Sequence, residues 1–459
     1  MLALTLEEIA RAVDGTVHGD PSVVVSGPAY VDSRAAEPDG LFVAVVGDRT
    51  DGHEYAAGAH AVLGSRPTEA PTVVVGDPVS ALGRLASHVV RRLGTTVVAL
   101  TGSQGKTGTK DYLAQVLATA GPTVATAGSF NNELGLPLTV LRADADTEFL
   151  VLEMGARGIG HIAYLCEIAP PRISAVLNVG TAHLGEFGSR EAIALAKGEI
   201  VEALPADGIA VLNADDDLVS AMAARTPATV LTFGATGDVA WRGVELDELG
   251  RPAFELGHAG EWHPVRLTQS GAHQVANASA AAALALAAGL PLDRVAAALS
   301  EARSASPMRM ELHERADGLL VVNDAYNANP ASMTAALEAL VAIGERRARR
   351  TVAVLGAMRE LGPTSYDEHV GVGRTAAELG VDLLVVVGEE AAGIAEGFAQ
   401  GGHSEAIVTA GRAEALDRVR ENASGADVVL VKASRGVALE TIADGLLAEP
   451  LVEGDGTAP

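Results

Sequence analysis

The segment 100–113, LTGSQGKTGTKDYL, has the residue types of a loop that binds phosphate. The apolar run TTVVALT that leads into it predicts a strand, and the run after it predicts a helix. In such a loop Gly105 lets the backbone N–H groups face an anion, Lys106 reaches the terminal phosphates, and the Thr107 hydroxyl binds Mg²⁺. The usual pattern begins with glycine where this chain has Leu100, so the sequence predicts a shorter variant of the loop. The alternative, a tight turn with a surface lysine, explains fewer of these features.

Three residues further along the chain could complete a metal site. Glu153 ends the predicted strand FLVL, and carboxylate oxygen is a preferred Mg²⁺ ligand, although a solvated strand end explains it equally well. His183 follows the strand ISAVLN, but imidazole is not the preferred partner of Mg²⁺, so taken alone it favours a structural role. Lys197 shares a helical face with Ile193 and Ile200, where a charged amine is costly. It is either a lysine that reaches water from the edge of this face, or an amine of lowered pKa that can add CO₂ and become a carbamate.

The elements that must position these residues fall into three sections. Residues 1–92 hold short apolar runs among turns and predict a small α/β domain. Residues 93–306 begin with the strand and glycine loop, continue with further buried strands, and change between about 239 and 270 to an alternating pattern that predicts antiparallel hairpins. Residues 307–452 alternate strands and helices and predict a Rossmann-like doubly wound sheet, followed by a tail at 453–459. The predicted fold class is therefore α/β with three domains, in which ligands lie at the carboxyl ends of parallel strands.

The composition excludes several functions. The chain has 459 residues and a net charge of −26, so its surface repels nucleic acid and anionic membranes, and a nucleotide site needs local cations and Mg²⁺. The single cysteine, Cys166, excludes an intrachain disulfide and fits a reducing cytosol. The N-terminus lacks the basic stretch of a signal peptide, and the most apolar run, near residues 276–292, predicts a buried helix instead of a membrane span. We expect a cytoplasmic monomer without a nucleic-acid partner or membrane insertion.

Together these motifs resemble those of the Mur ligases, the ATP-dependent amide-forming enzymes of peptidoglycan synthesis, over nearly the whole length of the chain. TGSQGKTGTKD is similar to the family's short phosphate loop, which accounts for the absent first glycine. By this resemblance LEMG, AHLGEFGS and AKGEI contain the metal glutamate, the metal histidine and the carbamylated lysine, which are Glu153, His183 and Lys197. The resemblance thus reverses the interpretation of His183 taken alone.

The resemblance also implies ligand contacts in each domain. Ser33 and Arg34 match the pair that holds the UDP-sugar, and Asn131 and Asn132 match residues that face the muramoyl substrate. The implied ATP contacts are Gly102, Ser103, Gln104, Gly105, Lys106, Thr107 and Gly108 of the loop, Asn277 on the adenine side, and Arg309, Asp324, Tyr326 and Asn329 in the C-terminal section. Lys432 and Ser434 match a loop that closes on the substrates. The implied catalytic residues are Lys106, Lys197, His183 and Arg309, and the implied metal ligands are Thr107, Glu153, His183 and Lys197.

The activity that the resemblance implies is formation of an amide through an acyl phosphate, with ATP and Mg²⁺. The run YNANPASM at 326–333 favours a member that joins D-Ala-D-Ala to UDP-N-acetylmuramoyl-tripeptide. The nearest alternative is a sister ligase that adds a single amino acid, and the N-terminal section disfavours a folate-type ligase. A nucleotide switch would need Asn-Lys-x-Asp, but NADD at 213–216 lacks the lysine. A scaffold without activity stays an alternative, although every residue with an implied role is present. The sequence leaves open whether the third peptide residue is diaminopimelate or lysine, and what the departures Gln104 and Ser129 do.

Overall fold

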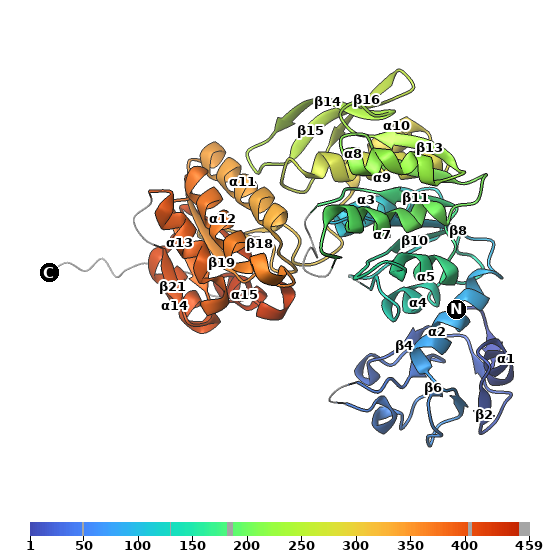
Figure 1. Cartoon of the computed structure of the whole chain (residues 1–459). Helices are drawn as coiled ribbons and strands as arrows, with labels where there is room; N and C mark the ends of the chain where they lie inside the picture. Colours follow the sequence, from blue (N-terminus) through green and yellow to red (C-terminus); the bar gives the residue numbers. More distant parts are fainter. Residues whose placement is uncertain (48–49, 129, 181–186, 403–405, 449–459) are drawn as a thin grey trace.

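The computed structural model describes residues 1–47, 50–128, 130–180, 187–402 and 406–448. Figure 1 shows three bodies, an N-terminal one in blue, a central one in green and yellow, and a C-terminal one in orange and red. Each of the three contains its own main sheet, which confirms the predicted α/β class with three domains. The exact domain boundaries stay a prediction.

The N-terminal domain is built on a small mixed sheet, in which the first four strands run parallel and the last is antiparallel. In spatial order the strands are β4 (Ala29–Tyr30), β5 (Leu41–Val43), β6 (Ala61–Gly64), β7 (Thr72–Val74) and β2 (Thr16–His18). The other elements are β1 (Leu4–Thr5), β3 (Val24–Val25), α1 (Leu6–Ala12), α2 (Pro78–Val90) and the 3₁₀ helices η1 (Ser33–Ala35) and η2 (Gly52–Tyr55). Helix α2 starts at Asp77, whose carboxylate accepts the N–H groups of Val79 and Ser80. The buried residues of α2 join one continuous hydrophobic core with the central domain.

The central domain holds a nine-stranded sheet that is parallel around the phosphate loop and antiparallel at one end. In spatial order its strands are β9 (Thr123–Ala125), β10 (Phe149–Glu153), β8 (Thr96–Thr101), β11 (Ile173–Val176), β12 (Ile209–Asn213), β13 (Thr229–Phe233), β14 (Val239–Leu246), β15 (Pro252–His258) and β16 (Glu261–Arg266). The last three confirm the predicted hairpins. Its helices are α3 (Lys106–Ala118), α4 (Gly135–Val140), α5 (His161–Ile168), α7 (Arg190–Glu202), α8 (Asp217–Ser220), α9 (Gln274–Ala287) and α10 (Leu292–Glu301), with the 3₁₀ helix η3 (Ala221–Arg225).

Successive residues of the central strands face opposite sides of the sheet, as the period of a strand requires. Val98 and Leu100 pack with α3, α9 and α10, whereas Val97 and Ala99 belong to the core shared with the N-terminal domain. The alanine-rich helix α9 is almost fully buried, as its sequence predicts. Helices therefore cover both faces of the parallel region, and polar groups reach a ligand only at the strand ends.

The C-terminal domain is the predicted doubly wound sheet with one added strand. In spatial order the strands are β17 (Glu311–Glu314), β18 (Leu320–Asn323), β22 (Asp427–Lys432), β19 (Arg350–Gly356), β20 (Leu383–Val387) and β21 (Ile407–Thr409). The helices are α11 (Pro330–Arg347), α12 (Ser365–Glu378) and α13 (Ala392–Gln400) on one face, and α14 (Arg412–Asn422) and α15 (Glu440–Ala448) on the other, with the 3₁₀ helices η4 (Gly362–Thr364), η5 (Glu389–Ala391) and η6 (Arg435–Val437). Strand β17 was not predicted, since its residues are polar and only partly buried.

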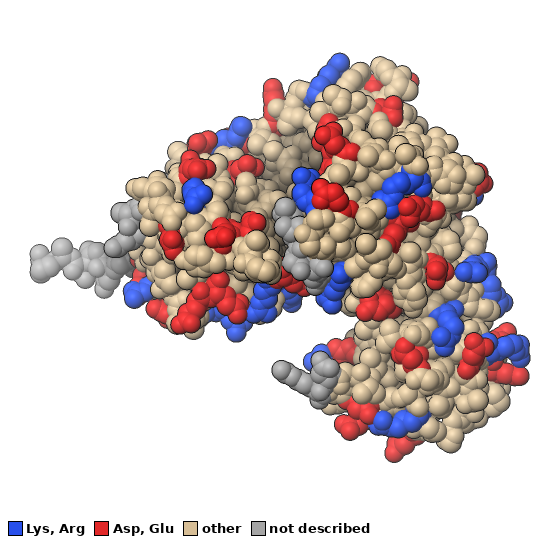
Figure 2. All heavy atoms as spheres, viewed as in Figure 1, with Lys and Arg blue, Asp and Glu red and all other residues tan. Residues whose placement is uncertain are grey.

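Acidic and basic side chains are interspersed on the face shown in Figure 2, so the negative net charge is not gathered there into one patch. Within the described ranges no helix is long and apolar enough to cross a bilayer.

Candidate active site

The phosphate-type loop connects β8 to α3, and its geometry requires glycine at one position. Gly105 has a φ of +78°, and a Cβ there would lie 2.4 Å from Oδ1 of Asn277. Asn178 holds the loop, because its Oδ1 accepts the N–H groups of Ser103 and Gln104, both at 3.0 Å, and its Nδ2 donates to the Gln104 carbonyl. No side chain of the described residues caps the N-terminus of α3, so its first N–H groups remain available to an anion. The unusual Gln104 is thus fixed by its backbone while its side chain is exposed.

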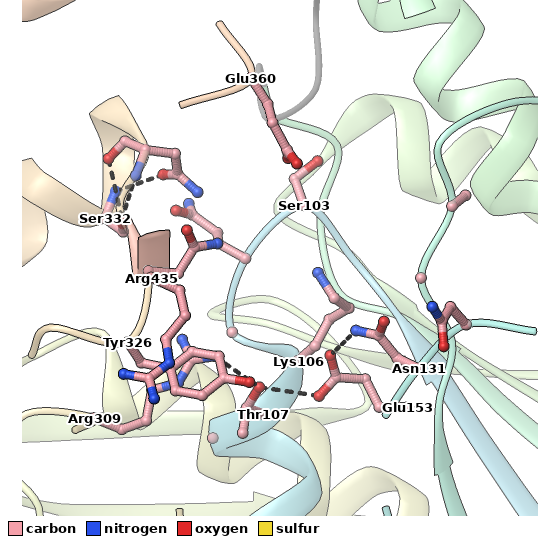
Figure 3. Close-up of a pocket in the computed structure, with 18 of the residues that line it drawn as sticks. Ser103, Lys106, Thr107, Asn131, Glu153, Arg309, Tyr326, Ser332, Glu360 and Arg435 are labelled. Atoms are coloured by element: carbon pink, nitrogen blue, oxygen red, sulfur yellow. Dashed lines mark hydrogen bonds between the residues drawn. The ribbon is translucent and has the colours of Figure 1, made fainter. Parts of the chain in front are cut away.

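A carboxylate lies directly beside this loop. Strands β8 and β10 are parallel, and their register pairs Glu153 with Leu100, the last but one residue of β8 before the loop. Glu153 is almost fully buried, and its two oxygens accept hydrogen bonds from the Thr107 hydroxyl at 3.0 Å and from the Asn131 amide at 2.7 Å (Figure 3). The guanidinium of Arg309 also donates to the Thr107 hydroxyl, at 3.2 Å. Residues from three other segments therefore converge near the start of α3.

Two lysines share this environment, of which Lys106 is half-buried and Lys197 is buried. Lys106 donates to the Gly102 carbonyl at 2.8 Å, and burial lowers its pKa, an effect that the charge of Glu153 opposes. Lys197 lies on α7, whose N-terminus the Ser189 hydroxyl caps, and its side chain is buried instead of reaching water from the edge of the helix. Burial and then the charge of Lys106 hold the pKa of Lys197 well below its usual value.

The C-terminal domain contributes the opposite wall through the ends of β18, β22 and β19. Arg309 stacks over the ring of Tyr326, with the guanidinium carbon 4.2 Å from the ring centre. Asp324 accepts the Met310 N–H at 3.1 Å and the ammonium of Lys432 at 2.5 Å. Lys432 is buried and also donates to the Asn327 carbonyl at 2.9 Å. In this structure it therefore fixes the segment after β18 against the end of β22.

One cavity of about 1140 Å³ joins these walls. The predicted site residues that line it are Ser103, Gln104, Gly105, Lys106, Thr107, Gly108, Asn131, Asn132, Glu153, Lys197, Asn277, Arg309, Asp324, Tyr326, Asn329, Lys432 and Ser434. Gly102 lies just behind the loop and contacts Lys106. Ser33 and Arg34 lie elsewhere, in the N-terminal domain, where an exposed Arg34 pairs with Asp32. His183 and Ser129 lie outside the described residues.

Several lining residues were not singled out from the sequence. Asn178 and Arg359 each lie within three residues of the end of a parallel strand, which is the signal that could have identified them. Glu360, which points into the cavity in Figure 3, has a φ of +65°, an uncommon backbone conformation for a residue with a side chain. His273 precedes α9, and burial lowers its pKa while the charge of Asp324 opposes the shift. No sequence pattern marks this electrostatic influence of Asp324 on His273, since the two residues come from different domains.

Comparison with known proteins identifies the class. The sequence pattern of the Mur ligase middle domain matches residues 100–285, and that of the "Mur ligase, glutamate ligase domain" matches residues 308–435. The chain therefore belongs to the Mur ligase family. This confirms the resemblance that its sequence motifs indicate.

Within this family the similar proteins carry one name. A protein of Mycobacterium tuberculosis named UDP-N-acetylmuramoyl-tripeptide–D-alanyl-D-alanine ligase is 46% identical over 98% of each chain. A crystal structure of MurF from Acinetobacter baumannii has a TM-score of 0.86 and 34% identity, covering 97% of this chain and 99% of its own. MurF from Thermotoga maritima in complex with ADP has a TM-score of 0.79 and 32% identity, covering 93% and 98%.

Proposed function

We propose that this protein joins D-Ala-D-Ala to UDP-N-acetylmuramoyl-tripeptide with hydrolysis of ATP, as a step of peptidoglycan synthesis. The observation that carries the proposal is the single cavity in which a phosphate-type loop and buried Glu153 face Arg309 and Asp324 of another domain. Relatives that match nearly the whole chain bear the corresponding name, and one of them was solved with ADP.

ATP lies between the central and C-terminal domains in this proposal. Its phosphates meet the uncapped N-terminus of α3 and the ammonium of Lys106, its adenine lies near Asn277, and Asp324 and Tyr326 contact it from the C-terminal side.

The buried oxygens of Thr107 and Glu153 are ligands of the kind that Mg²⁺ prefers. Mg²⁺ usually completes its coordination shell with phosphates and water, so these two residues fit the ion. His183 and a carbamate on Lys197 are the further ligands that the family resemblance implies. Bound Mg²⁺ would neutralise charge on the transferred phosphoryl group.

The reaction requires a better leaving group on the substrate carboxylate. The terminal phosphoryl of ATP moves to that carboxylate and gives an acyl phosphate and ADP. The amine of D-Ala-D-Ala then attacks the acyl carbon, loses a proton, and inorganic phosphate leaves. Lys106 and Arg309 supply positive charge where the transferred group becomes most anionic, and the surrounding domains exclude water from the acyl phosphate.

The buried amine of Lys197 has a second part in this proposal. Its neutral form can add CO₂, lose a proton and become a carbamate anion. The lowered pKa makes that neutral form accessible. An anion at this position would lie in the field of the Lys106 cation and would help to hold the reacting groups in place.

Arg359 is our candidate for binding the carboxylate of the incoming dipeptide. The backbone N–H of Arg359 donates to the Ser434 hydroxyl at 2.9 Å. This hydrogen bond joins the loops that follow β19 and β22. Its guanidinium lies so close to Gly436 that a Cβ there would overlap it. Its ion pair with Glu390 spans 3.8 Å between exposed side chains, so it contributes little and leaves the guanidinium available.

Replacing Arg359 with alanine should raise the KM for D-Ala-D-Ala by about 10- to 100-fold, the usual range for losing a hydrogen bond to a charged group. The KM for ATP should stay within about threefold of the wild-type value, because no hydrogen bond or ion pair of the described residues joins Arg359 to the phosphate loop. The C-terminal amide of D-Ala-D-Ala lacks the carboxylate, so the wild type should disfavour it and the variant should not. An R359A variant that still discriminates between the two dipeptides would contradict this assignment.

The proposed function is tested by ADP release with UDP-N-acetylmuramoyl-tripeptide as acceptor. We expect turnover with D-Ala-D-Ala and none with single D- or L-amino acids. Turnover with a single amino acid would instead identify a sister ligase. Parallel assays with diaminopimelate- and lysine-containing tripeptides determine the preferred acceptor.

A further inference from the structure

Lys110 is a buried charged residue on α3 for which the reaction described above has no use. Its ammonium has three N–H donors, and three acceptors surround it. These are the Asp111 carboxylate at 2.5 Å, the Thr126 carbonyl at 2.9 Å and the Ser306 hydroxyl at 3.4 Å. All four residues are buried. A buried ion pair adds little net stability compared with apolar packing, so its value lies in what it orients.

The three acceptors belong to three different segments. Asp111 is on α3 itself, one turn beyond the phosphate loop. Thr126 follows β9, and its hydroxyl accepts the N–H of Glu153 at 3.1 Å. Ser306 lies in the linker that leads from the central to the C-terminal domain. The Lys110 ammonium therefore joins the helix of the phosphate loop, the segment that supports Glu153, and the linker that carries Arg309.

A second contact from α3 holds the same linker. Gln115 lies on the same helix and exchanges two hydrogen bonds with the backbone of Arg303, each of 2.9 Å. Between them, Lys110 and Gln115 attach the linker to α3 at positions 303 and 306. The side chain of Arg303 is nevertheless exposed.

The other end of the linker is attached to the C-terminal domain. The Met308 carbonyl accepts the Tyr326 N–H at 3.3 Å, and the Met310 N–H donates to Asp324 at 3.1 Å. Pro307 alone separates the residue fixed to α3 from the first residue fixed to the C-terminal domain. Met308 and Met310 have φ values of +57° and +49°, a strained conformation that persists only where surrounding contacts impose it. Arg309 lies between them.

We propose that Lys110 is a positioning residue for Arg309. It fixes the linker against the phosphate-loop helix, so that the guanidinium reaches the Thr107 hydroxyl when the two domains are together. The kinetic part of this inference rests on the proposed function, whereas its structural part does not. A displacement of about 1 Å at a phosphoryl-transfer site can lower the rate about 100-fold, so a contact of this kind has a measurable effect.

The structural part is tested by limited trypsin digestion of the full chain, with fragments identified by mass spectrometry. Lys110→Met and Ser306→Ala should each accelerate cleavage after Arg303, since each removes one of the two contacts that attach the linker to α3. Thr109→Val is the matched control, because Thr109 is buried beside Lys110 and its hydroxyl has no hydrogen-bond partner among the described residues. Equal cleavage rates in the wild type, S306A and K110M would overturn the inference whether or not the protein is a ligase.

The kinetic part is tested by a double-mutant cycle with Arg309→Ala, measured by ADP release. We expect K110M to lower kcat/KM for ATP by about 10- to 100-fold. Because Lys110 acts through Arg309, the double variant should be within about threefold of R309A alone. The inference would be overturned if the decreases in kcat/KM of K110M and R309A multiplied in the double variant. A folded K110M with wild-type rates would overturn it as well. If K110M does not fold, S306A combined with Gln115→Leu takes its place in the cycle with the same two outcomes, since that pair leaves no buried charge unpaired.

Discussion

Replacing Lys106 with alanine should lower the rate of ADP formation by about 1000-fold or more, while the protein keeps its fold. Groups that neutralise charge in a phosphoryl-transfer transition state commonly contribute factors of this size. The stability should change little, because burial disfavours the charged form of the half-buried lysine, and among the described residues its ammonium donates to the Gly102 carbonyl alone. The measurement combines an ADP-release assay with thermal unfolding followed by circular dichroism.

Lys106→Arg is the informative companion variant, since it keeps the charge but changes its shape. We expect it to bind ADP and remain far below wild-type turnover. An unfolded K106A would instead support a structural role for the lysine, and near-normal turnover in K106A would contradict a phosphate contact altogether.

Replacing Lys197 with alanine should abolish turnover, to below about 1% of the wild-type rate, because it removes both the amine and the carbamate that would hold reacting groups in place. The side chain is buried beside Lys106 and Glu153, and burial followed by the Lys106 charge lowers its pKa, so the wild-type amine can react with CO₂. Added bicarbonate should not rescue the variant, since alanine has no amine to modify.

The carbamate itself has a separate measurement. Wild-type protein in buffer depleted of CO₂ should lose activity and regain it with bicarbonate, and ¹³C-labelled bicarbonate should give a carbamate signal that K197A lacks. Near-wild-type turnover in K197A would refute the carbamate, and a wild type indifferent to CO₂ depletion would show that the free amine suffices.

Much of the central site follows from local sequence patterns. Glu153 ends an apolar strand and the glycine loop follows another, and parallel pairing of β10 with β8 then brings the two together without further information. The spacing of Ile193 and Ile200 likewise placed Lys197 on an apolar helical face, although it left open whether the side chain reaches water, and the structure shows it buried.

Contacts between residues that lie far apart in the sequence could not be predicted in the same way, because they depend on tertiary packing. Lys432 stood out as a substrate residue because of its motif, yet its ammonium lies against Asp324, which follows a strand more than a hundred residues earlier. The backbone strain at Met308 and Met310 has no sequence signal either, since methionine has no preference for a positive φ. Both depend on partners that the chain supplies from far away in the sequence.

The continuous core between the N-terminal and central domains has a consequence for how such genes can recombine. Helix α2 contributes side chains to a hydrophobic interior that also contains residues of α4 and α5, so its apolar surface has to match both neighbours. An exchange of the first domain alone between two relatives therefore places mismatched surfaces in one interior. Among the described residues the buried clusters of the central and C-terminal domains are separate, so a junction at Pro307 divides neither of them, provided that the incoming part keeps Arg309. The C-terminal domain is the part of this chain best suited to exchange as a module.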